Sequence, residues 1–96
     1  MTGASADMTD AEKATKVIEA LKAAESATPQ AALPILNDLV GLVQAHAEQE
    51  LEVEEARSSA FMAICEIGKA LHRGQPADKL WASAISATER WKSLAK

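Results

Sequence analysis

The amino-acid sequence predicts an all-α protein, folded as an antiparallel helical hairpin or bundle. Apolar residues make up 48% of the chain, yet only Phe61, Trp81 and Trp91 are aromatic, and alanine supplies much of the rest. Apolar side chains recur at steps of three and four residues, which is the spacing of one helix face. Helix start and stop signals bracket these runs. We expect a single helical domain over residues 9–96 after a disordered lead-in over residues 1–8.

The first helix is expected over residues 10–25. Thr9 and Glu12 have the spacing of a capping box, in which each side chain accepts a hydrogen bond from the other residue's backbone N–H. Four apolar residues then follow at helical spacing: Ala14, Val17, Ile18 and Leu21. The pattern fades at ESATPQ, where Thr28 can cap a helix and Pro29 can occupy its first turn.

The central helix is expected to be long, covering residues 34–73. A proline well inside a helix removes a hydrogen bond, so we expect a short turn and then a helix start at Pro34. The first conventional stop is HRGQP at 72–76, where basic residues precede Gly74 and Pro76. The implied helix has about 40 residues and a length of about 60 Å. One apolar seam stays in register along it, through Ile35, Leu39, Leu42, His46, Gln49, Val53, Ala56, Ala60, Ile64, Ile67 and Leu71.

The alternative layout is a monomeric four-helix bundle whose chain breaks near residues 46–55. In both layouts a last helix covers residues 77–95. Its apolar stripe consists of Leu80, Ala84, Ala87, Trp91 and Leu94, with Trp81 and Ile85 one step round.

A long central helix offers more apolar seam than helices 10–25 and 77–95 can cover. The uncovered part predicts a homodimer, in which helices pair as in a coiled coil around the seam. In that arrangement His46 and Gln49 form a polar layer that sets the pairing register. The predicted dimer seam comprises Leu39, Leu42, His46, Gln49, Val53, Ile64, Ile67 and Leu71.

Charge is strongly segregated along this acidic chain, whose net charge is −4. Residues 23–56 hold seven acidic residues and no Lys or Arg, whereas residues 57–96 hold seven basic and three acidic residues. Such complementary ends favour antiparallel self-association or a partner of opposite charge. The basic residues are dispersed rather than aligned, which argues against nucleic-acid binding.

The acidic stretch HAEQELEVEEA, residues 46–56, admits three interpretations. The first is a solvated helix face with His46 and Gln49 on the seam, and a lone seam histidine also admits a pH switch. The second is a docking surface for a basic partner, formed by Glu48, Glu52 and Glu55. The third is a small-molecule or metal site near His46, Gln49 and Glu50. Bundle metal sites use Glu-x-x-His pairs from two helices, and the sequence has no such pair.

Catalysis and cofactors are not expected. Cys65 lies in the apolar run FMAICEIG beside Glu66, a setting that favours a small buried hydrophobe over a reactive thiolate. Ser58 and Ser59 lack a nucleophile motif, and no P-loop, dinucleotide fingerprint or Cys–His zinc spacing occurs. No apolar run approaches the roughly 20 residues that span a bilayer. With a lone cysteine and no signal-like opening, we expect a cytoplasmic protein that does not associate with membranes.

Two kinds of residue point to helix contacts. Gly41 and Gly68 each cost about 1 kcal/mol inside a helix relative to alanine, which either simple tolerance or close approach of a second helix explains. Trp81 lies off the main stripe, so we expect it to be a partner-facing anchor while Trp91 enters the core.

The function that these observations favour is non-enzymatic regulation through protein binding. An anti-activator, adaptor or small chaperone fits, acting as a homodimer on a partner with a basic or an apolar, helix-accepting surface.

Overall fold

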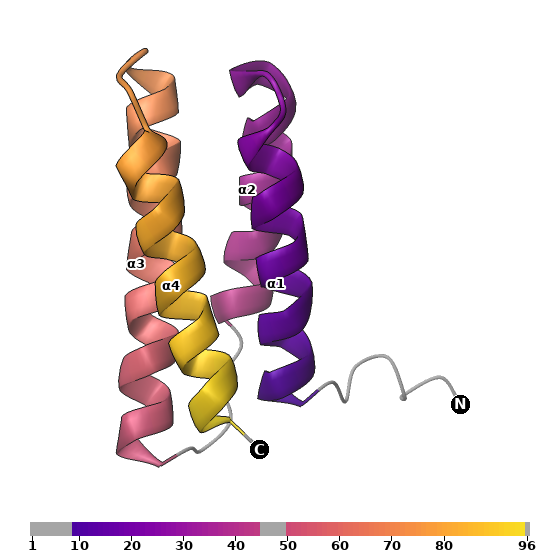
Figure 1. Cartoon of the computed structure of the whole chain (residues 1–96), viewed down its shortest axis with the longest axis vertical. Coiled ribbons are helices and arrows are strands. Elements are labelled where there is room, and N and C mark those ends of the chain that lie inside the picture. Colours follow the sequence, from indigo (N-terminus) through magenta and orange to yellow (C-terminus); the bar gives the residue numbers. More distant parts are fainter. Residues whose placement is uncertain (1–8, 45–49, 96) are drawn as a thin grey trace, which may run out of the picture.

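The computed structural model describes residues 9–44 and 50–95, which form four α-helices and no strand. The helices are α1 (Asp10–Glu25), α2 (Pro29–Gln44), α3 (Leu51–His72) and α4 (Asp78–Leu94). Consecutive helices run in opposite directions, with α1 and α2 on one side of the bundle and α3 and α4 on the other (Figure 1). Each helix packs on the next and α4 packs back on α1, which closes the ring. The all-α prediction is confirmed.

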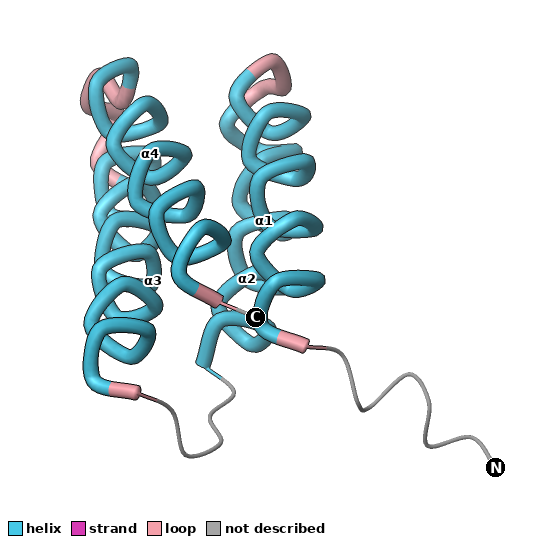
Figure 2. The backbone as a smooth tube through the Cα atoms, turned by 60° about the horizontal axis from the view of Figure 1, so that its bottom comes forward, coloured by secondary structure: helices cyan, strands magenta, loops and turns pink. Residues whose placement is uncertain are grey.

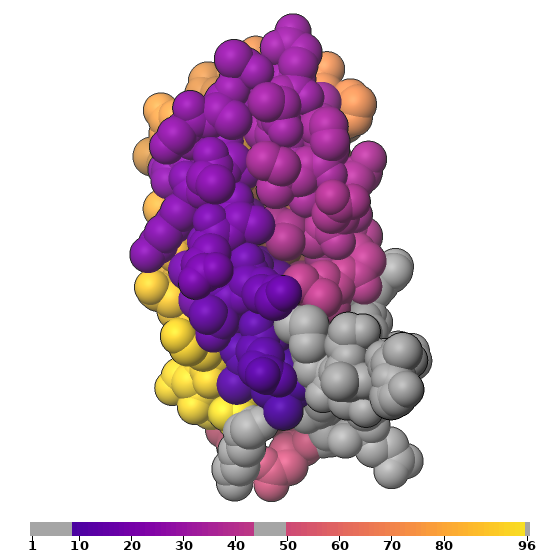
Figure 3. Space-filling view, turned by 90° about the vertical axis from the view of Figure 1, so that its right-hand side faces the viewer, coloured from indigo at the N-terminus to yellow at the C-terminus, as the bar shows by residue number. Residues whose placement is uncertain are grey.

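The core lies between the four helices and takes residues from each of them. Its largest fully buried side chains include Leu21 of α1, Val43 of α2, Ile64 of α3 and Trp91 of α4. The α1–α2 and α3–α4 connections lie together at one end of the bundle (Figure 2). Seen from the side, α1 and α2 form one continuous face (Figure 3).

The start of α1 follows the predicted capping box. The Thr9 hydroxyl accepts a hydrogen bond from the Glu12 backbone N–H at 3.1 Å, and the Glu12 carboxylate accepts one from the Thr9 N–H at 2.9 Å. The helix ends at Glu25, so its predicted range is confirmed. The four apolar residues predicted for its inner face are all buried.

The start of α2 differs from the prediction. The helix begins at Pro29, not at Pro34, and the Thr28 hydroxyl accepts a hydrogen bond from the Ala31 N–H at 3.2 Å. Pro34 lies inside the helix, where it cannot donate to the carbonyl of Gln30. Both residues are exposed, so water can satisfy that carbonyl and the proline is tolerated.

The prediction of a single long central helix is wrong. The Val43 carbonyl oxygen of α2 lies 2.7 Å from Nη1 of Arg57 in α3, although the two residues are 14 apart in sequence. Within one helix they would be about 21 Å apart along the axis. The alternative four-helix layout therefore describes the fold. The apolar spacing continued across both helices because both face the same core, so the register gave no sign of the break.

The predicted stop after α3 is confirmed at Gly74. This residue has φ +67, a left-handed conformation that glycine adopts without steric cost. Gln75 donates its backbone N–H to the Ala70 carbonyl at 2.8 Å, and Gly74 donates to that of Leu71 at 3.2 Å. These two bonds define a Schellman motif, which closes the helix end.

The last helix is also confirmed, at Asp78–Leu94. Its two adjacent apolar stripes both face inward. The buried centre is formed by Trp81, Ala84, Thr88 and Trp91, while Leu80, Ile85, Ala87 and Leu94 are partly buried around it.

Candidate functional site

The candidate site is a groove of about 350 Å³ between α2 and α3. It uses the middle of α2 and the second part of α3. Its lining consists of Leu33, Leu36, Asn37, Val40, Ile64, Cys65, Gly68, Lys69, His72 and Arg73.

The floor of the groove is apolar. Leu36 and Ile64 belong to the core and are 3% and 1% exposed, whereas Leu33 and Val40 are half-buried on the α2 wall. These α2 residues recur at steps of three and four, so a single helix face supplies that whole wall. The groove is thus a place where the core comes close to the surface.

Gly68 helps to keep the groove open. A Cβ atom placed on Gly68 would meet no heavy atom of the described residues within 4 Å, and the same holds for Gly41 of α2. The explanation by close approach of another helix within the chain is therefore wrong for both glycines. At Gly68 the missing side chain instead leaves free space against the apolar floor.

The rim of the groove is cationic. Lys69, His72 and Arg73 are exposed on the last turn of α3 and at its C-cap, and no acidic residue of the described part of the chain lines the groove. Lys69 makes one ion pair, to Glu66 at 3.4 Å, in which both side chains are more than half exposed. Such a pair is worth only about 0.2–1 kcal/mol, so Lys69 can exchange it for another acidic partner.

Cys65 forms part of the groove wall. The sequence predicted a buried small hydrophobe, but the residue is only half-buried and its thiol is free. The correction follows from the helix packing, since Cys65 lies beyond the edge of the α3 core face formed by Val53, Ala56, Ala60, Ile64 and Ile67.

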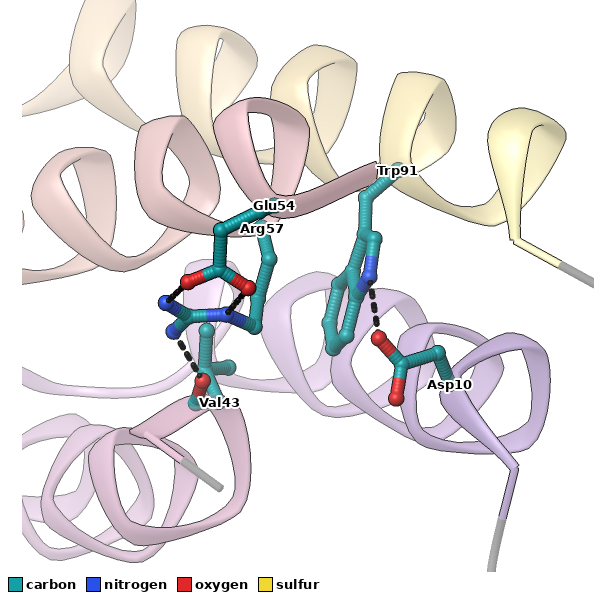
Figure 4. A network of polar contacts seen from close by, with 5 residues as sticks. All are labelled: Asp10, Val43, Glu54, Arg57 and Trp91. Carbon is teal, nitrogen blue, oxygen red and sulfur yellow. Dashed lines mark hydrogen bonds and ion pairs between the residues drawn. The ribbon is translucent and has the colours of Figure 1, made fainter. Parts of the chain in front are cut away.

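A second polar cluster joins the helices at the opposite end of the bundle (Figure 4). Arg57 donates from Nη1 to the Val43 carbonyl and from Nε to the Glu54 carboxylate at 3.2 Å, and Nη2 also pairs with Glu54. Across the bundle, Trp91 of α4 donates from Nε1 to the Asp10 carboxylate of α1 at 3.1 Å. These contacts bind α2 to α3 and α1 to α4, so their role is structural.

The hydrogen bond that Arg57 donates to the Glu54 carboxylate raises the pKa of Arg57, although partial burial opposes it; the charges of Glu54 and Asp10 add to the rise. The guanidinium therefore stays cationic beside the C-terminal end of α2, where free carbonyls favour a positive charge.

The acidic docking residues are placed only in part. Glu52 and Glu55 are exposed on the first two turns of α3, and Glu50 is the exposed N-cap residue. Glu48, His46 and Gln49 lie outside the described residues. The predicted acidic docking surface therefore stays a prediction, as does the alternative site near His46, Gln49 and Glu50.

Trp81 is not a surface residue. It is only 6% exposed and belongs to the core, because the two stripes of α4 both pack inward. We therefore do not retain it as a binding residue.

The predicted dimer seam is covered by the chain itself. Leu39, Val53, Ile64 and Ile67 are buried in the core, and Leu42 and Leu71 are partly buried against it. The surplus apolar seam from which we predicted a homodimer is thus absent among the described residues. The expected surplus followed from the predicted long helix, whereas the packing of four shorter helices covers these apolar residues.

The sequence analysis did not predict the basic rim of the groove or the contacts of Arg57 with Val43 and Glu54. His72 and Arg73 were interpreted only as a helix stop signal, and Lys69 only as one of the dispersed basic residues. For Arg57 a local signal existed, because Glu54 is three residues before it, a spacing at which helix side chains meet. Its contact with Val43, however, depends on tertiary packing.

Other site types find no support in the part of the chain that the structure describes. No group of three His, Cys, Asp or Glu side chains there could hold a metal ion. None of the four helices is both long and apolar enough to cross a membrane. In comparisons with known proteins, no family model, curated protein sequence or solved structure matches this chain.

Proposed function

We propose that this chain is a non-enzymatic protein-binding module that holds an apolar helix with acidic flanks in the α2–α3 groove. One observation carries the proposal: an apolar floor lies directly beside three exposed cationic or titratable side chains, Lys69, His72 and Arg73. Anti-activators, adaptors and small chaperones all require such a binding step, and they differ in the partner that they hold.

The shape of the groove supports a helical partner. An amphipathic helix docks by placing a few apolar side chains from one face into a groove between helices. The open space at Gly68 admits such an anchor without displacing a side chain. Because glycine has no side chain, a second helix can approach the α3 backbone closely at this position.

The charges at the rim define the flanks of the partner. Lys69 and Arg73 are one helical turn apart and exposed, so they can meet acidic side chains that flank the apolar anchors on the side of the partner facing the end of α3. Exposed pairs add orientation and association rate more than affinity. Because the groove admits only a few anchors, we expect a Kd of roughly 10–100 µM, about −5.5 to −7 kcal/mol.

A designed peptide tests the proposal. The probe is a capped helical peptide of about 14 residues, or about four turns, with leucine on one face and glutamate on its flanks. Isothermal titration calorimetry measures its affinity for the wild-type chain and for two variants, G68M and G41M. Gly68→Met fills the groove, whereas Gly41→Met places the same side chain in equally open space on α2, away from the groove lining.

We expect G68M to lower the affinity at least tenfold and G41M to leave it within about twofold. A peptide with lysine in place of glutamate should bind more weakly than the acidic peptide, and K69E/R73E should reverse that preference. The charge-matched control K79E/K92E changes two exposed cations of α4. Equal binding by G68M and G41M, or no preference for the acidic peptide, would contradict the proposal.

The volume of the groove favours a second candidate, a small acidic amphiphile. Small-molecule pockets usually measure about 300–1,000 Å³, a range that includes this groove. The anionic dye anilinonaphthalene sulfonate is the corresponding probe. If the dye binds in a manner sensitive to G68M while the acidic peptide does not bind, the small-molecule function replaces the protein-binding one.

A further inference from the structure

The outward face of α3 carries a stripe of residues with unusual symmetry. The stripe consists of Leu51, Glu55, Ser58, Met62, Cys65 and Lys69, all exposed or half-exposed. Their spacing alternates between four and three residues, which is the 3.5-residue period at which two helices stay in contact. This stripe lies opposite the buried α3 face.

The two large hydrophobic side chains that are exposed in the described part of the chain both belong to this stripe. Leu51 is 73% exposed and Met62 is 60% exposed. Single exposed apolar residues are common, but here both lie on one helix face and at interface spacing. They mark the stripe as a surface that another molecule can cover.

Two opposite charges on the stripe lie at equal distances on either side of Met62. Glu55 precedes Met62 by seven residues and Lys69 follows it by seven, so each lies about 10 Å from it along the axis. A second copy placed antiparallel, with its Met62 against this one, brings Glu55 opposite the partner's Lys69 and Ser58 near the partner's Cys65. A parallel copy would instead place Glu55 against Glu55 and Lys69 against Lys69.

Neighbouring charges agree with the antiparallel arrangement. The first turns of α3 also carry Glu50 and Glu52, whereas its end carries His72 and Arg73. Antiparallel pairing therefore places the acidic start of each α3 beside the basic end of the other α3. Glu66, the in-chain partner of Lys69, lies on the flank of the stripe, so Lys69 lies between Glu66 and Glu55 of the second copy in this arrangement. The helix dipole favours the same order of charges, but it does not account for Leu51 and Met62 on the same stripe.

We propose that α3 pairs antiparallel with α3 of a second copy through this stripe, forming a weak, symmetric homodimer centred on Met62. This face is distinct from the internal seam considered at first. Cys65 and Lys69 also line the groove, so pairing and groove binding compete; that consequence rests on the proposed function, whereas the pairing does not.

Sedimentation equilibrium of the full chain tests the pairing through a charge exchange. We expect a dimer whose Kd rises at least tenfold in E55K and in K69E, since each variant opposes like charges at two symmetric positions. The double variant E55K/K69E should return to within about threefold of the wild type. An equimolar mixture of the two single variants should form a heterodimer, because both contacts between positions 55 and 69 are then complementary.

The controls are E19K and K92E, which reverse exposed charges of α1 and α4 and should leave the dimer unchanged. Circular dichroism checks that each variant keeps its helicity. A chain that stays monomeric at all accessible concentrations overturns the pairing. So does a dimer that responds to E19K or K92E as strongly as to E55K.

Disulfide trapping tests the register independently. In S58C the two cysteines of one chain are seven residues apart in the same helix, too far to join, so any disulfide links two copies. With oxidised glutathione we expect S58C to form covalent dimers through Cys65 of the second copy, and S93C, on α4, to form far fewer. Equal trapping of S58C and S93C would contradict the register.

Discussion

Replacing Arg57 with methionine should destabilise the fold substantially. The variant R57M keeps an apolar stem of similar length but removes the donor to Val43, a residue that is fully buried. A hydrogen bond from a charged donor contributes about 1.5–3 kcal/mol. The Arg57–Glu54 pair adds only about 0.3–0.5 kcal/mol, because its residues are three apart on one helix and Glu54 is 39% exposed. We therefore expect a loss of about 2 kcal/mol.

Urea unfolding followed by circular dichroism measures this loss, and thermal unfolding should show a Tm lower by roughly 10 °C. The variant E54Q should lose only about 0.5 kcal/mol, since the bond to Val43 remains. R90M makes the same chemical change at an exposed position of α4 and should stay within about 0.5 kcal/mol of the wild type. If R57M is no less stable than R90M, Arg57 does not fasten α2 to α3.

The raised pKa of Arg57 determines how the loss of stability in R57M depends on pH. Because folding raises the pKa, the stabilisation is fully present below the ordinary arginine value and is lost only as the pH rises through the raised one. The difference in unfolding free energy between R57M and the wild type should therefore be the same at about pH 7 and about pH 10. A difference that shrinks within this window would point to another titrating group.

Three further predictions concern the helix cap and the groove. T9A removes the hydroxyl of the capping box and should cost about 1 kcal/mol in urea unfolding, whereas T9S should cost much less; equal losses would assign the effect to packing. G68A should stabilise the chain by about 0.5–1 kcal/mol, since its Cβ meets open space and alanine is the better helix former; destabilisation would reveal a contact at that position. Cys65 should react with maleimide in the folded chain, and the acidic peptide should slow this reaction. In the variant S93C the peptide should leave the reaction rate of the added cysteine, on α4, unchanged.

The sequence predicted those parts of the fold that local chemistry decides. The start of α1 depends on Thr9 and Glu12, three residues apart, and the end of α3 depends on Gly74, so both were visible without tertiary information. Helices α1 and α4 were accordingly placed within a residue or so.

The break between α2 and α3 was not predictable in the same way. The chain from 42 to 67 contains no Gly or Pro, and its apolar residues continue at steps of three and four. One helix facing a partner and two helices facing each other give the same spacing. What separates the two layouts is a contact at long range, between Arg57 and Val43.

The groove was missed because it belongs to two helices at once. Ile64 was interpreted as a seam position and Arg73 as part of a helix stop, whereas Leu36 was given no role and Lys69 was one of the dispersed basic residues. Only the packing of α2 against α3 brings the apolar floor and the cationic rim together. Trp81 is the reverse case, a predicted binding residue that is buried. Its position off the main stripe led us to expect exposure, but the neighbouring helices cover it.

The most direct test of groove binding is a titration of the ¹⁵N-labelled chain with the acidic helical peptide, followed by amide chemical shifts. We predict saturable shifts confined to the second part of α3 and the middle of α2, with Gly68 and Asn37 among the strongest, and little change in α1. Shifts centred on α1 and α4, or none at peptide concentrations well above 100 µM, roughly the weakest Kd expected, would contradict the account.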